Sequence, residues 1–240
     1  MNPSQHFLHL SDLSPARRLG LTTWVTLLCL LAWDFSGLDM GIMQILADRS
    51  GFTLRDNWWL ETVLHTRAKQ LAMLVYLALV VMVWWPPQVL RQLSRWQRSE
   101  IVVGIALSII TISTLKSFSL TSCPWELKDF GGQAMRVSHW LFSTADGGSG
   151  HCFPGGHVSS AFGFMALALP WLASDSTAQR RTGLRILLIV LGVGFLLGLT
   201  QTLRGAHFPS HTLWTGFICW SVVLANHFLW GWLAHRRPNP

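Results

Sequence analysis

Two histidines four residues apart are the clearest sign of chemistry in this sequence. His207 and His211 flank Pro209 and Ser210, a pair suited to the start of a helix that Ser210 would cap. One imidazole could act as a nucleophile or base while the other orients it. The spacing also suits a metal ion, but a zinc site would want a third ligand, and there is no His-Glu-x-x-His pattern. We therefore favour a site without a metal.

A glycine-rich turn leads directly to another histidine, in the segment Phe153-Pro154-Gly155-Gly156-His157. Two glycines let the backbone approach a ligand closely just where a helix begins. The unpaired amides and the positive end of the helix dipole would both favour a phosphate there. An ordinary turn into a helix is the alternative. The histidine that follows the glycines favours the anion site.

The elements that must position these residues are membrane helices. Half of the residues are hydrophobic and 12% are charged, which excludes an ordinary soluble globule. The 14 Trp and 13 Phe suit the interfacial belts of a membrane protein. Residues 1–240 are predicted to form one all-α domain, a bundle of six transmembrane helices. We place these helices near 19–37, 68–86, 99–117, 157–174, 183–203 and 211–233.

Basic residues predict the orientation of this bundle. With both termini in the cytoplasm, the inner segments hold ten basic and three acidic residues, in agreement with the positive-inside rule. The formal net charge of +7 then needs no nucleic acid as a partner, and no nucleic-acid-binding motif is present. We expect a bacterial inner (plasma) membrane protein with its site facing the periplasm or the exterior. The ten basic residues are Arg17, Arg18, Arg91, Arg95, Arg98, Arg180, Arg181, Arg185, Arg236 and Arg237.

This topology brings the unusual polar residues to the outer end of the bundle. Lys116 ends the third predicted helix, His157 opens the fourth, and Arg204 lies between the fifth and the sixth together with His207 and His211. Ionisable groups at membrane depth are costly and usually functional. Lys116 alone could instead extend to the lipid headgroups.

Two of the four cysteines lie in the second large outer loop, 118–156. A disulfide between Cys123 and Cys152 would tie the segment after Lys116 to the turn before His157, if the compartment is oxidising. Two unpaired thiols are the alternative. Asp34, near the outer end of the first helix, could assist the site, but an interfacial carboxylate is the favoured interpretation.

Three segments resemble the three signature motifs of the type 2 phosphatidic acid phosphatase superfamily, whose members are integral-membrane phosphatases related to vanadium haloperoxidases. The family patterns are Lys, six residues, Arg-Pro; then Pro-Ser-Gly-His; then Ser-Arg, five residues, His, three residues, Asp. They correspond to Lys116 through Cys123-Pro124, to Pro154 through His157, and to Thr200-Gln201 through His207 and His211. The resemblance covers about residues 100–215.

Four positions depart from these patterns. Cys123 and Gln201 stand where the family has arginines, Gly155 replaces the serine, and His211 replaces the final aspartate. Arg204, three residues beyond Gln201, is the best candidate to replace a lost arginine. Arg136 and Lys128 in the long loop are weaker candidates. A neutral His211 could accept a hydrogen bond in place of the aspartate.

The resemblance implies a hydrolase that dephosphorylates a lipid phosphate or diphosphate at the outer leaflet. In this scheme His207 attacks phosphorus, His157 protonates the leaving oxygen, and water cleaves the phosphohistidine, with phosphate held by Lys116, Arg204, Gly155 and Gly156. No metal or other cofactor is required. A lipid phosphotransferase, or a lipid-headgroup-binding protein that has lost its chemistry, is the alternative. The sequence indicates neither the lipid nor the oligomeric state.

Overall fold

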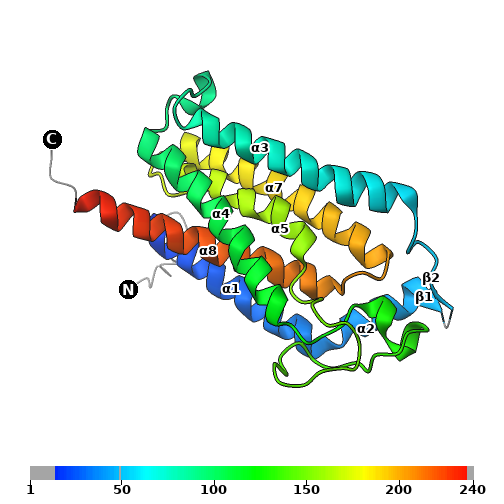
Figure 1. Ribbon diagram of the computed structural model, residues 1–240. Coiled ribbons are helices and arrows are strands. Elements are labelled where there is room, and N and C mark those ends of the chain that lie inside the picture. Colours follow the sequence, from blue (N-terminus) through cyan, green and yellow to red (C-terminus); the bar gives the residue numbers. More distant parts are fainter. Residues whose placement is uncertain (1–13, 49, 237–240) are drawn as a thin grey trace, which may run out of the picture.

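The computed structural model describes residues 14–48 and 50–236, and its core is a bundle of long helices (Figure 1). Within the described residues, five helices are long and apolar enough to cross a membrane. These are α1 (Pro15–Ser36), the continuous helix Trp59–Met82, α4 (Arg95–Phe118), α7 (Thr177–Leu203) and α8 (Pro209–His235). They correspond to five of the six predicted spans.

The remaining predicted span, 157–174, is not one regular helix. It consists of α5 (Gly156–Phe162), a 3-10 segment η6 (Gly163–Leu167) and α6 (Leu169–Leu172). Pro170 lacks the N–H that would continue the helical hydrogen bonding, so a break here has a simple cause. Phe162, Met165 and Leu169 are almost fully buried, and the segment therefore lies in the centre of the bundle.

Two glycines of α7 allow the helices that carry the site to pack closely. A Cβ atom on Gly194 would lie 2.2 Å from Cε1 of Phe162 in α5, and one on Gly198 would lie 2.3 Å from Cγ2 of Thr212 in α8. Small residues four apart are a common device for close helix contact in membranes. They bring α5 and α8, which carry His157 and His211, against the same helix.

The second predicted span begins nine residues earlier than expected and ends four residues earlier. The predicted helix was 68–86, whereas the structure has a π-helix η2 (Trp59–Arg67) that continues into α3 (Ala68–Met82). The Asn57 side chain accepts hydrogen bonds from the amides of Trp59 and Leu60 at 3.1 and 3.2 Å, which caps this start. Charged residues interrupt the apolar pattern in η2, and the segment was therefore not predicted as a helix.

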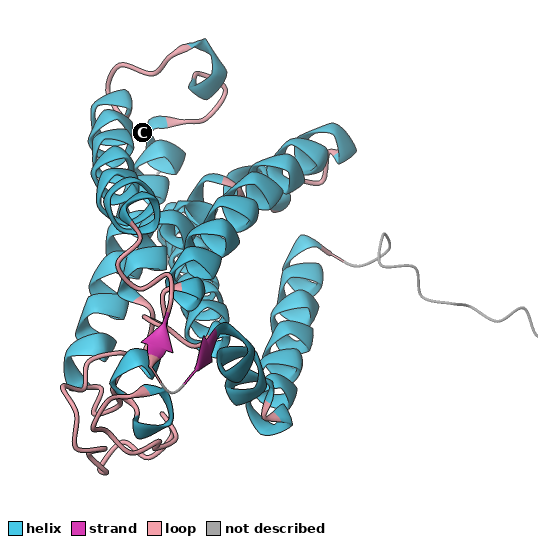
Figure 2. Ribbon diagram, turned by 90° about the vertical axis from the view of Figure 1, so that its right-hand side faces the viewer, coloured by secondary structure: helices cyan, strands magenta, loops and turns pink. Residues whose placement is uncertain are grey.

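Short elements cover one end of the bundle, which faces the viewer in Figure 2. They are α2 (Leu38–Leu46), the antiparallel pair β1 (Ala47–Asp48) and β2 (Gly51–Phe52), and the 3-10 turns η4 (Pro124–Glu126) and η5 (Lys128–Phe130). A small second core of Met43, Phe52, Leu127, Phe130 and Ala134 holds these pieces together.

The start of α1, the end of α8 and the 3-10 turn η3 (Gln88–Leu90) that follows α3 all lie toward the opposite end of the bundle (Figure 1). The chain ends that we predicted to be cytoplasmic, 1–13 and 237–240, lie outside the described residues.

Candidate active site

His207 and His211 lie where α7 gives way to α8, and both are buried. Their Nδ1 atoms are 3.4 Å apart. Ser210 does not cap α8 as expected, because the helix begins one residue earlier at Pro209. Instead the Ser210 amide donates to Oδ1 of Asp39 at 3.0 Å, and its hydroxyl donates to Oδ2 of the same carboxylate. The N-terminus of α8 is thus held by α2.

The surroundings of His207 keep its imidazole neutral. Burial lowers the pKa of His207 to about 3, and the nearby charges of Lys116 and His157 act in the same direction. A neutral ring at pH 7 has one nitrogen with a free lone pair, as a nucleophile requires. Lys116 and His157 are therefore within electrostatic range of His207.

Lys116, in the last turn of α4, extends across the start of α5. A Cβ atom on Gly156 would lie 3.2 Å from Cδ and 3.5 Å from Nζ of this lysine. At the preceding position, a Cβ atom on Gly155 would lie 3.3 Å from Cγ2 of Val158 and 3.4 Å from Oγ1 of Thr215. A side chain at either glycine would press on its neighbours. The ammonium and the glycine turn therefore form one side of a compact site.

His157 is held with a defined proton position. Its Nε2 lies 3.0 Å from the carbonyl oxygen of Leu64, and because a carbonyl only accepts, this nitrogen carries the proton. Nδ1 is buried and has no hydrogen-bond partner among the described residues. The ring also lies against His65, with 4.3 Å between the ring centroids. Nδ1 is thus the atom of His157 that is left to exchange a proton with a ligand.

Arg204 is buried, but its partners belong to other segments than Lys116 and the glycine turn. Its Nε donates to the carbonyl oxygen of Arg55 at 2.8 Å, and its Nη2 lies 3.3 Å from Oε2 of Glu61. Glu61 belongs to η2, the helix that also holds His157 through Leu64. Of the weaker candidates, Lys128 opens η5 and the exposed Arg136 lies in the long loop.

The sequence reasoning missed the contribution of η2. Glu61 and His65 were assigned to an outer loop, yet they contact Arg204 and His157. Apolar residues at 60, 64, 68 and 71 have helical spacing, and this signal could have extended the predicted helix upstream. A π-helix is rare and frequently occurs at functional sites.

Cys123 and Cys152 form a disulfide next to these histidines. The Sγ atom of Cys152 lies 3.3 Å from Nδ1 of His207. Among the described residues, one group of side chains brings potential metal-ligand atoms together, and it consists of these two cysteines and His207. With the sulfurs joined to each other, no thiolate is available to a metal.

Comparison with known proteins gives one match. A model of the PAP2 superfamily matches residues 99–236, which include Lys116, the glycine turn and all three buried histidines named above. No curated protein and no solved structure matches the chain significantly.

Proposed function

Because the chain belongs to the PAP2 superfamily, whose members include the type 2 phosphatidic acid phosphatases, we propose that it is a membrane phosphatase acting on a lipid phosphate or diphosphate. One observation carries the proposal: a buried, neutral His207 lies near Lys116 and His157. A nucleophile, a cation and a proton carrier are the groups that metal-free phosphoryl transfer needs.

In the proposed reaction, the Nε2 lone pair of His207 forms a bond to phosphorus while the bond from phosphorus to the leaving oxygen breaks. His157, in its protonated form, gives a proton to that oxygen. Water then attacks the phosphohistidine, the N–P bond breaks, and His157 takes up the proton that water loses. Lys116 and the backbone amides at the glycine turn stabilise the charge on the phosphoryl oxygens.

An apolar groove beside the site supports a lipid substrate. The groove, about 430 Å³, lies between α3, the α5–η6 segment and α7, and we call it the α3–α7 groove. Ala161 follows His157 by one turn of α5, and Ala68 follows His65 by three residues, so the groove begins next to the site. Its lining includes Ala72, Val75, Phe164, Val193 and Leu197.

The placement of the arginines supports an outer-leaflet site. The start of α1, the turn between α3 and α4, the start of α7 and the end of α8 all lie at the end of the bundle away from His207 (Figure 1). These segments carry most of the arginines of the chain. By the positive-inside rule this end is cytoplasmic, and the site then faces the periplasm or exterior.

The first test is phosphate release by the purified protein in detergent, with excess chelator, over a panel of lipid phosphates and diphosphates. We expect wild-type release, none from His207→Ala, and traces from His157→Ala, since a general acid is worth about 10²–10⁴ in rate. His235→Ala, which removes an exposed histidine near the end of α8, is the matched control.

Unimpaired turnover by both site variants would reject these roles. Loss of wild-type activity in chelator would reject the metal-free scheme. Phosphate release only when a second lipid is supplied, with the phosphate recovered on that lipid, would identify a phosphotransferase. Binding of the lipids without release or transfer would identify a headgroup-binding protein.

A further inference from the structure

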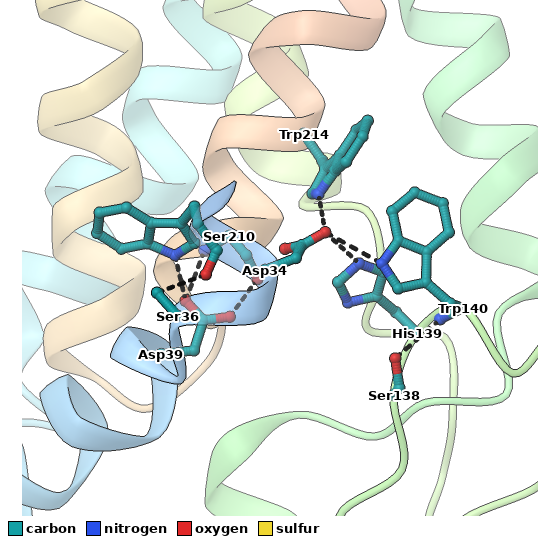
Figure 3. A network of polar contacts seen from close by, with 9 residues as sticks. Asp34, Ser36, Asp39, Ser138, His139, Trp140, Ser210 and Trp214 are labelled. Carbon is teal, nitrogen blue, oxygen red and sulfur yellow. Dashed lines mark hydrogen bonds and ion pairs between the residues drawn. The ribbon is translucent and has the colours of Figure 1, made fainter. Parts of the chain in front are cut away.

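Asp34 is a buried carboxylate for which the reaction scheme so far has no role. It lies near the end of α1, and its side chain is 5% exposed, so protein side chains rather than lipid headgroups or water surround it. Oδ2 accepts hydrogen bonds from the indole nitrogens of Trp214 at 2.8 Å and Trp140 at 3.0 Å (Figure 3). Oδ1 has no hydrogen-bond partner among the described residues. An incompletely paired buried carboxylate is costly and calls for a functional explanation.

His139 connects this carboxylate to the side of the site. Its Nε2 lies 3.4 Å from Oδ2 of Asp34 (Figure 3), and its ring stacks on Phe153 with 4.2 Å between centroids. Burial lowers the pKa of His139 despite the nearby carboxylate, so the ring is neutral at pH 7. The contact is not aligned as a hydrogen bond, and Nε2 has no hydrogen-bond partner among the described residues. The negative charge of the carboxylate nevertheless favours a proton on Nε2, which leaves Nδ1 as an acceptor.

His139, His211 and Asp34 line one cavity of about 300 Å³. The two rings are edge to face, with centroids 6.0 Å apart. Nδ1 of His211 lies 3.4 Å from Nδ1 of His207. Trp214, bound by Asp34, lies three residues after His211 on α8.

We propose that Asp34 is a positioning residue that, through His139 and α8, holds His211 in the orientation that directs the His207 imidazole toward phosphorus. The inference rests on the proposed function. The family motif has an aspartate where this chain has His211, and the inference places a carboxylate of α1 behind that imidazole. When Nε2 of His207 bonds to phosphorus, the ring becomes cationic, and the line of His211, His139 and Asp34 stabilises that charge.

The test compares Asp34→Asn with Glu100→Gln, in steady-state kinetics and thermal unfolding. Glu100 is also a buried carboxylate beside an imidazole, 2.6 Å from His227, and it lies near the start of α4 at the far end of the bundle. We expect Asp34→Asn to lower kcat about tenfold to a hundredfold with KM within about twofold, as for lost orientation of a catalytic group. Glu100→Gln should change the melting temperature and leave kcat within about twofold.

A second measurement does not depend on turnover. Nitrogen-15 NMR of histidine-labelled protein should show His139 as the Nε2–H tautomer in wild type, and a mixture of tautomers in Asp34→Asn. Wild-type kcat in Asp34→Asn, or an unchanged tautomer, would overturn the inference. Equal losses of kcat in Asp34→Asn and Glu100→Gln would reduce Asp34 to a structural role. If wild type releases no phosphate while the NMR shift appears, the proposed function fails and the positioning of the imidazoles stands.

Discussion

At the scale of single residues, the protonation of His207 links the chemistry to stability. In the unfolded chain this histidine takes up a proton near its ordinary pKa of about 6.5, whereas in the folded protein burial lowers the pKa to about 3. Between these values the unfolded state binds more protons than the folded state, so acid destabilises the fold. The same burial that keeps the proposed nucleophile neutral therefore makes the fold less tolerant of acid.

Stability should be less sensitive to acid in His207→Gln than in wild type, because the variant has no imidazole to protonate at this position. His207 alone should lower the free energy of unfolding by about 2 kcal/mol between pH 7 and pH 5. Unfolding in detergent, followed by tryptophan fluorescence, should show a weaker pH dependence in His207→Gln than in wild type. His235→Gln, which changes an exposed histidine, should retain the wild-type dependence. Equal slopes for all three proteins would contradict the assigned pKa.

At the scale of elements, the disulfide joins the segment after α4 to the turn before α5. It joins cysteines that are 29 positions apart in sequence and lies against His207. Replacing both Cys123 and Cys152 with serine should lower stability by about 3 kcal/mol. It should also lower kcat, because Lys116 and His157 lose the link between their segments.

Thermal unfolding and phosphate release, each with and without reductant, check this prediction. Cys29→Ser removes an exposed free cysteine of α1 and serves as the control. Reductant should affect wild type and Cys29→Ser but not the double variant. A double variant with wild-type stability and turnover would show that the disulfide has no part in holding the site.

The comparison of sequence and structure shows what apolar patterning can predict. Five of the six predicted helices are long helices in the structure, because continuous hydrophobic stretches are a strong signal for helices of membrane length. The patterning missed η2, where Glu61, His65 and Arg67 interrupt the apolar pattern. It also missed the break in the segment 157–174, although Pro170 in this segment disfavours a continuous helix.

Motif spacing identified the residues around His207 but not their supports. Asp34 looked like a surface residue because the partners that bury it, Trp140 and Trp214, lie 106 and 180 residues away in sequence. The contact of His65 with His157 likewise joins two distant segments. Such contacts arise from the packing of whole helices, and no local pattern in one sequence encodes them.

At the scale of the whole molecule, the uneven distribution of arginines predicts which end of the bundle faces outward. In a Cys29→Ser background, Ser143→Cys in the long loop should react in intact cells with a thiol reagent that cannot cross membranes. Gln92→Cys, in the turn between α3 and α4, should react only after the cells are opened. Both positions are exposed, so access to the reagent depends on the side of the membrane. The reverse pattern would place the site in the cytoplasm.

The assembly of α3, α5–η6 and α7 also creates the α3–α7 groove, and its position next to His157 predicts that substrate length matters. If the hydrocarbon chain of the substrate lies in this groove, Ala72→Trp should block it and displace the phosphate from His207. A displacement of about 1 Å can lower a rate about a hundredfold, so kcat/KM for a long-chain lipid phosphate should fall at least about tenfold. A short-chain, water-soluble analogue of the same headgroup needs no groove, and its kcat/KM should stay within about twofold.

Leu74→Trp provides the matched control, since Leu74 lies on the same helix, is 64% exposed and does not line the groove. It should leave the ratio of long-chain to short-chain kcat/KM unchanged. An equal loss for both substrates in Ala72→Trp would mean that the tryptophan distorts the site itself. An unchanged ratio with full activity would mean that the chain of the lipid leaves the protein by another path, and the groove would then have no part in substrate selection.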